Sequence, residues 1–159
     1  MTAEPAHEPA QLPHGAYAGL VSRLGAILID VLAISLLATA TRRLPAALWE
    51  SVLALPEPRW LAELATAAAA VVPWLYFTIS WWLTNRTVGG LILGLCVLRD
   101  DGGELSLPHA AVRAVVGLAL APLWMIGLLS VLWDPRRRAW HDRLLRTVVR
   151  YSPTTRSPG

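Results

Sequence analysis

Charge is scarce in this sequence, and lysine is missing altogether. Only 16% of the 159 residues are charged, whereas an average soluble domain carries about 25%. This deficit argues against an ordinary cytosolic protein, and the 55% share of hydrophobic residues excludes a disordered chain. The 14 basic residues, all arginine, outnumber the 11 acidic ones. On so apolar a chain this excess indicates a membrane surface, and not nucleic acid, as the partner.

Cysteine and catalytic motifs are also in short supply. The single cysteine, Cys96, excludes an intramolecular disulfide. The sequence has no phosphate-binding loop, dinucleotide fingerprint, HExxH motif or serine nucleophile elbow. Cys96, His109, His141 and Asp142 do not have the spacing of a metal site. We therefore expect no enzyme activity, no metal and no cofactor.

Long apolar runs are what the chain has in abundance. The first, Leu24–Ala40, would measure about 26 Å as a helix, close to the thickness of a bilayer core. We place membrane spans at about residues 24–41, 61–83 and 111–133. Pro122 and Gly127 interrupt the third, which could cross fully, split or re-enter. The predicted fold class is an all-α membrane protein with two to three transmembrane helices.

Tryptophans mark the ends of the predicted spans. Trp60 precedes the second span, Trp81 and Trp82 end it, and Trp133 ends the third. Tryptophan is enriched at both membrane interfaces, so we expect these four side chains to act as interface anchors.

The remaining segments are assigned by composition. Residues 1–22 are polar and Pro-rich and predict a flexible tail, residues 23–150 a single membrane domain, and residues 151–159 a disordered tail. Residues 44–59 suggest a short interfacial piece.

A strand and a turn are predicted between the second and third spans. Leu91–Leu98 is rich in branched residues, Asp100–Gly103 is a strong turn signal, and apolar residues alternate at Leu105 and Leu107. We expect a short β-hairpin on the cytoplasmic side.

Arginine counts suggest an orientation. Seven of the arginines follow the third run, which places the C-terminus in the cytoplasm. Among them, Arg136, Arg137 and Arg138 are expected to contact anionic lipid headgroups. Three full spans would put the N-terminus outside; two spans with a re-entrant third, or an unrecognised fourth span, would put both ends inside.

Asp30 is the most informative residue, because it lies inside the first apolar run. A carboxylate near the centre of a membrane helix costs about 2.5–3.5 kcal/mol. Arg23, seven residues earlier, shares its helical face, and Arg113 is the other candidate partner. Asp30 is therefore either a paired packing residue or a carboxylate that binds a proton or cation.

The order of several motifs resembles the RDD family of small bacterial and archaeal membrane proteins. The resemblance is carried by Arg23–Ala26 with Ile29–Asp30, by Thr87–Leu95, by Arg99–Ser106, and by His141–Arg143 with Thr147–Val149. It implies that the Arg and two Asp residues that name the family are Arg23, Asp30 and Asp142. Val88, Gly90 and His109 depart from the usual pattern.

The resemblance also bears on topology and function. If Arg23, Asp30 and Asp142 form one network, with Arg113 and His141 nearby, both termini lie inside. The molecular function of the family is largely unassigned, and transport has been proposed. We expect a structural or accessory protein of the prokaryotic plasma membrane, either a homo-oligomer or a subunit of a larger complex. The alternative is an oligomeric cation/proton transporter that uses Asp30.

Overall fold

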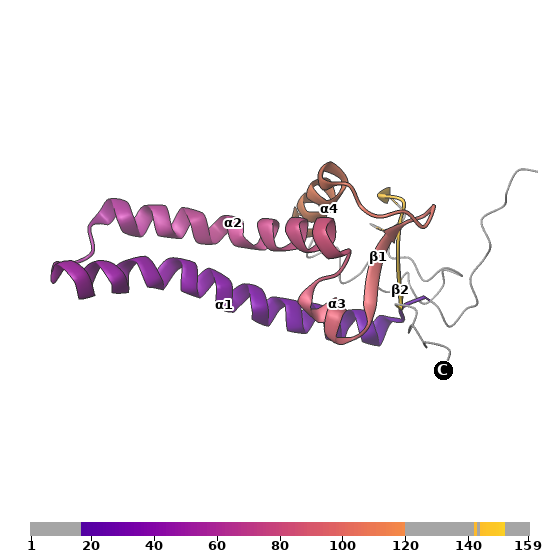
Figure 1. Cartoon of the computed structure of the whole chain (residues 1–159), viewed down its shortest axis with the longest axis horizontal. Coiled ribbons are helices and arrows are strands. Elements are labelled where there is room, and N and C mark those ends of the chain that lie inside the picture. The colour runs from indigo at the N-terminus through magenta and orange to yellow at the C-terminus, as the bar shows by residue number, and fades with distance from the viewer. Residues whose placement is uncertain (1–16, 120–141, 143, 152–159) are drawn as a thin grey trace, which may run out of the picture.

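The computed structural model describes residues 17–119, 142 and 144–151. This part of the chain is mostly helical, with one small two-stranded sheet (Figure 1). In chain order its elements are α1 (Leu20–Leu53), α2 (Arg59–Thr84), α3 (Val88–Ile92), β1 (Leu95–Arg99), α4 (Leu107–Ala119) and β2 (Thr147–Tyr151).

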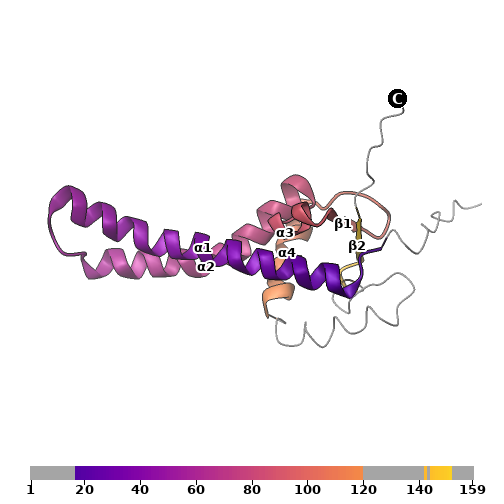
Figure 2. The same ribbon diagram turned by 90° about the horizontal axis from the view of Figure 1, so that it is seen from below.

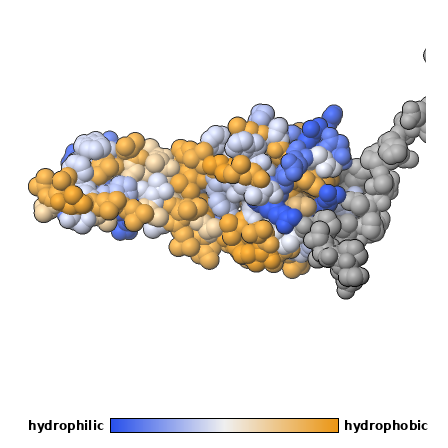
Figure 3. Space-filling model, viewed as in Figure 1, coloured by the Kyte–Doolittle hydropathy of each residue, from blue (hydrophilic) through white to orange (hydrophobic). Residues whose placement is uncertain are grey.

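The helices α1 and α2 form a long antiparallel hairpin, visible in both ribbon views (Figures 1 and 2). Both are long and apolar enough to cross a membrane. Their outer faces expose large apolar side chains, including Leu28 (71% exposed), Leu36 (65%) and Leu64 (61%). Figure 3 shows this apolar surface along the hairpin. Soluble monomers rarely expose apolar surface on this scale, so a lipid environment explains it best.

The ends of α1 differ from the sequence predictions. Tyr17 and Ala18 are buried, and α1 begins at Leu20, so the polar tail ends earlier than residue 22. The reason is tertiary, since the Ala18 N–H donates to the Val149 carbonyl at 3.0 Å. At its other end α1 continues through Pro45 to Leu53, inside the predicted interfacial piece 44–59. Good helix formers after Pro45 sustain this extension.

The predicted hairpin after the second span is wrong. The turn forms, with the Gly102 N–H bonded to the Arg99 carbonyl at 2.9 Å, but the chain does not return as a strand. Leu105 is buried, and α4 begins at Leu107. The strand that pairs with β1 is β2, in antiparallel register from Leu95 opposite Tyr151 to Arg99 opposite Thr147. Local alternation identified one strand but could not identify its distant partner. Likewise, Tyr151 ends β2, within the tail predicted at 151–159.

Only the first part of the third predicted span is described. The described part of α4 has 13 residues and measures about 20 Å. It packs against α2. Residues 120–133 of the predicted span 111–133 lie outside the described residues.

The elements α3, α4, β1 and β2 gather at one end of the hairpin, around the start of α1 and the end of α2 (Figures 1 and 2). We call this end the head. Its apolar core includes Ala18, Ala26, Trp81, Leu95 and Ala114. The buried charged side chains of the described chain also lie here.

Candidate functional site: two buried polar clusters in the head

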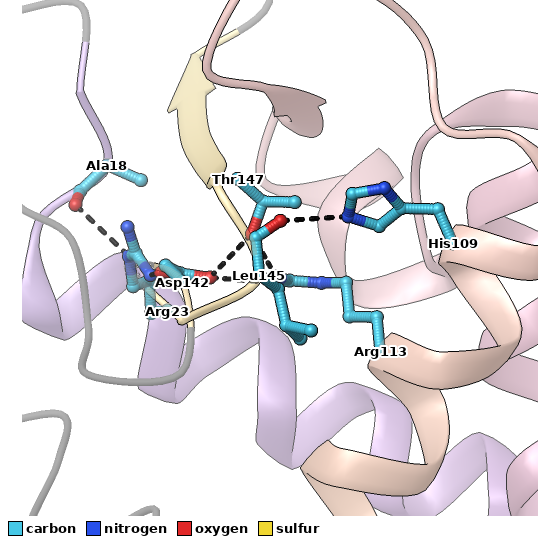
Figure 4. A network of polar contacts seen from close by, with 7 residues as sticks. All are labelled: Ala18, Arg23, His109, Arg113, Asp142, Leu145 and Thr147. Carbon is cyan, nitrogen blue, oxygen red and sulfur yellow. Dashed lines mark hydrogen bonds and ion pairs between the residues drawn. The ribbon is translucent and has the colours of Figure 1, made fainter.

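The first cluster is built around the carboxylate of Asp142, which is completely buried. Its Oδ2 accepts from Nη1 of Arg23 at 2.5 Å, and its Oδ1 accepts from Nη2 of Arg113 at 2.7 Å. Arg23 comes from the first turns of α1 and Arg113 from the middle of α4 (Figure 4). The Asp142 carboxylate thus joins α1 to α4 through two arginines that lie 90 residues apart in the sequence.

Arg113 has further contacts that fix its guanidinium group. Its Nη1 donates to the hydroxyl of Thr147, the first residue of β2, and its Cζ lies 4.9 Å from the centroid of the Trp81 ring. One turn before it on α4, His109 bonds through Nε2 to the Leu145 carbonyl at 2.9 Å (Figure 4). The cluster therefore ties α4 to β2 and to α2 as well as to α1.

Burial makes this cluster sensitive to the loss of any one member. Arg23 is 6% exposed and Arg113 is 3% exposed. Removing one partner of a buried ion pair costs about 3–5 kcal/mol, because the other charge is left uncompensated in a poorly solvated site. Because the Asp142 carboxylate bonds to both arginines, its loss would remove one ion pair from Arg23 and one from Arg113.

The second cluster surrounds Asp30, which is 4% exposed. Its Oδ1 accepts from the Tyr76 hydroxyl at 2.7 Å and from the Gly89 N–H at 2.7 Å. Its Oδ2 accepts from the Thr87 hydroxyl at 2.6 Å. The Val88 N–H in turn donates to the Tyr76 hydroxyl at 3.0 Å. Three direct donors supply the hydrogen bonds that an ionised carboxylate needs out of water.

A close approach between α1 and α3 brings the backbone of Gly89 to Asp30. A Cβ atom on Gly89 would overlap the backbone carbonyl of Ala26, one turn before Asp30 on α1. Glycine is therefore required at this contact. Thr87 caps α3 by accepting from the Gly90 N–H at 3.1 Å, so its hydroxyl serves both α3 and Asp30.

A small cavity separates the two clusters, with a volume of about 70 Å³. Its polar lining includes Arg23 and Arg113 from the first cluster, Asp30 and Thr87 from the second, and Arg86. Apolar side chains of α1, α2, β1 and β2 complete the wall. Since about 10–15 Å³ accommodates one water, the cavity has room for a few waters or one small ion.

The structure brings together most of the charged residues that the sequence singled out, but in two groups. Arg23, Arg113 and Asp142 form one network. Among the described residues neither candidate partner, Arg23 or Arg113, bonds to Asp30, whose oxygens accept from uncharged donors. The physical reason is that backbone and hydroxyl groups of the α2–α3 segment reach Asp30 and satisfy it without an ion pair.

The tryptophans predicted as membrane anchors differ in how far their side chains are exposed. Trp60 and Trp82 are 57% and 46% exposed, as anchors at an interface would be, and they lie near opposite ends of α2. Trp81 is only 5% exposed, because it packs beneath Arg113 and stacks on Phe77. Its prediction as an anchor is therefore wrong. His141, Arg136, Arg137, Arg138 and Trp133 lie outside the described residues.

Sequence reasoning missed several polar residues that complete the site. Tyr76 and Asn85 carried no recognisable signal, and Thr147 appeared only as part of the family resemblance, without a role. Asn85 ends α2 with a positive φ of 55°, and its Oδ1 accepts from the Leu105 N–H at 3.1 Å. Thr87 could have been found, since a threonine before a short glycine-containing turn is a common helix cap. No group of three or more potential metal ligands occurs among residues 17–119, 142 and 144–151.

Comparison with known families identifies the family of the chain. The family model named RDD matches residues 17–146, which is most of the chain and includes Arg23, Asp30, Arg113 and Asp142. The chain belongs to the RDD family. The three residues that the resemblance matched to the family name, Arg23, Asp30 and Asp142, are all buried in the head of this RDD protein. No curated protein and no solved structure matches the chain.

Proposed function

We propose that this RDD protein is an accessory or structural subunit of the prokaryotic plasma membrane. In this proposal the α1–α2 hairpin anchors the chain in the bilayer, and the head lies on the cytoplasmic side. There it presents a fixed surface to a partner protein or to anionic lipids. Family membership and the two apolar helices support the membrane setting.

The observation that carries the proposal is that the buried charged side chains bond to segments distant in the sequence. Asp142 bonds to arginines of α1 and α4, and Asp30 holds α3 against α1. These bonds join segments far apart in sequence, as expected of groups that set the shape of a surface. Within residues 17–119, 142 and 144–151, one hairpin with a small head also encloses little room for a transport pathway.

Affinity purification from native membranes tests this role. The tagged full-length chain should co-purify with a stable assembly, identified by mass spectrometry. The variants Asp142→Asn and Asp30→Asn should lose that assembly, because the head surface loses its shape. The matched control is Asp101→Asn, since Asp101 is 58% exposed and forms a surface ion pair with Arg99. An assembly that survives both buried substitutions would contradict the proposal.

A second candidate function is cation or proton transport by an oligomer through Asp30. The observation in its favour is that Asp30 lines the cavity of the head. A carboxylate beside a cavity can exchange a proton or bind an ion. In proteoliposomes, ion flux should occur with the native chain and disappear with Asp30→Asn. Ion flux that persists in Asp30→Asn would reject this mechanism. A transporter of this kind should also self-associate when purified, without another subunit.

A further inference from the structure

A groove opens between α1 and α2 at the end of the hairpin farthest from the head (Figure 1). Its volume is about 620 Å³, within the range of about 300–1,000 Å³ that is typical of small-molecule sites. The described residues that line it are Arg42, Arg43, Ala46, Ala47, Glu50, Glu57, Ala62 and Thr66. The three alanines keep the groove wide, and the four charged side chains make it polar.

The four charged side chains of the groove balance in sign but do not pair. Arg42 and Arg43 are positive, and Glu50 and Glu57 are negative. Within residues 17–119, 142 and 144–151, none of the four forms an ion pair. The Oε1 atom of Glu57 is buried and has no hydrogen-bond partner in this part of the chain. A buried acceptor without a partner is costly, and such groups commonly mark a ligand or water.

The last turns of α1 have their polar face towards the groove and their apolar face outwards. Arg42, Ala46 and Glu50 follow one another at a spacing of four residues and line the groove. Leu44 and Leu48, on the other face, are 58% and 62% exposed. A surface helix of a soluble protein has the opposite arrangement, with its apolar face towards the interior. This part of the hairpin therefore suits a lipid exterior and a polar occupant in the groove.

Helix length places the groove at the depth of the lipid headgroups. If the hydrocarbon core begins at Leu24, where the first apolar run starts, about 30 Å of helix ends near Leu44. The exposed Trp60, at the start of α2, lies where an interface anchor is expected. The groove extends from Arg42 to Glu50 along α1. It therefore occupies the headgroup layer on the side of the membrane opposite the head.

The charges of the groove narrow the class of headgroup. Guanidinium groups match phosphate oxygens, and carboxylates accept from a primary ammonium group, which has three N–H donors. A glycerol headgroup has no amine and would leave Glu50 and Glu57 without a partner. A choline headgroup has no N–H donor and is commonly bound by aromatic cages, whereas none of the described lining residues is aromatic. An ethanolamine headgroup supplies both the phosphate and the ammonium group.

We propose that the groove binds the headgroup of an ethanolamine phospholipid. Arg42 and Arg43 hold the phosphate, and Glu50 and Glu57 hold the ammonium group. The acyl chains lie along the exposed apolar face of α1. The inference rests on the bilayer crossing that is part of the proposed function, but it does not depend on an accessory role for the protein.

Native mass spectrometry of the full-length chain in nonionic detergent tests the proposal. Phospholipids with ethanolamine, choline and glycerol headgroups and the same acyl chains compete at equal concentration. The ethanolamine lipid should be bound about tenfold more than either of the others, because it alone satisfies both signs of charge. Glu57→Gln and Arg43→Gln should each reduce this preference to about threefold or less.

The matched controls are Glu63→Gln and Arg59→Gln. Both side chains are exposed at the same end of the hairpin and are not among the lining residues of the groove, so these variants should keep the full preference. Equal binding of the three lipids by the native chain would overturn the proposal, as would the same preference in Glu57→Gln and Glu63→Gln. Stronger binding of the glycerol lipid would also contradict it, because the arginines would then act without the glutamates.

Two further measurements separate the alternatives. Free phosphoethanolamine at the concentration of the lipid should not displace it, because the free compound lacks acyl chains. Displacement would identify a free zwitterion as the ligand and reject the lipid. The chain should also stay in membranes during alkaline carbonate extraction. Its release would contradict the bilayer crossing and with it the proposed function, whereas a missing lipid preference alone would contradict only the site in the groove.

Discussion

At the scale of single residues, the two buried aspartates of the head, Asp30 and Asp142, have different partners. Asp142 is compensated by positive charge from Arg23 and Arg113, whereas Asp30 is compensated by hydroxyl and backbone dipoles. The sequence predicted that Asp30 matters because an acid in an apolar run requires a partner, and it indicated Asp142 only through the family resemblance. It could not predict which donors each acid meets, since those donors come from segments up to 119 residues away.

The bond between Arg23 and Asp142 can be measured by a double-mutant cycle. Asp142→Asn should lower the free energy of unfolding by about 3–5 kcal/mol, because it removes the carboxylate that two buried arginines share. Arg23→Gln should lower it by less, because Arg113 still bonds to Asp142. The double variant should be more stable than the sum of the two losses predicts, by at least about 1 kcal/mol. Chemical denaturation in detergent provides the values.

The exposed pair Arg99–Asp101 is the control for that cycle. Its side chains are 49% and 58% exposed at a separation of 2.9 Å, so the coupling should be about 0.2–1 kcal/mol. A coupling in the buried pair no larger than in this surface pair would show that Asp142 is not an organising residue.

At the scale of elements, the contact between α1 and α3 depends on close backbone approach. The five-residue helix α3 could not be stable alone, because isolated helices of this length are marginal. It is held by the Thr87 cap, by the bond of Gly89 to Asp30, and by packing of Gly89 on Ala26. The sequence alone could not predict this contact, because Asp30 and Gly89 are 59 residues apart.

Gly89→Ala tests this contact. The added methyl group overlaps the Ala26 carbonyl, so α3 must move away from α1 and the bond to Asp30 must lengthen. We expect a loss of about 1–3 kcal/mol in stability, measured by denaturant unfolding. The control is Gly25→Ala, whose methyl group would meet only the end of the Leu93 side chain, 3.1 Å away. Equal stability of the two variants would contradict the close-packing argument.

At the scale of the whole molecule, the first and last described segments lie together. Tyr17 pairs with Arg150 in an isolated bridge, and the Ser22 hydroxyl lies 2.5 Å from the Tyr151 hydroxyl. Both segments belong to the head, at the opposite end from the α1–α2 connection (Figure 1). This favours the same side of the membrane for the two termini, one of the arrangements that arginine counting left open.

Cysteine accessibility in intact cells tests that topology. In a Cys96→Ala background, single cysteines at Pro5 and Thr155 should be protected from an impermeant thiol reagent, because both termini are expected in the cytoplasm. A cysteine at Leu55, which is 55% exposed at the far end of the hairpin, should be labelled. Labelling of only one terminus would reject the shared location.

The sequence by itself determined the membrane character, the two long helices and the residues of interest. Hydrophobic length and the cost of an acid in an apolar run are local properties, readable from consecutive residues. Tertiary structure decided which strand pairs with β1, that Trp81 is buried beneath Arg113, and that Asp30 and Asp142 belong to separate clusters. These depend on contacts between distant segments, whose geometry follows from packing the head and not from local sequence. The scarcity of charge indicated a membrane protein, and packing gathered the buried charges of the described residues in the head.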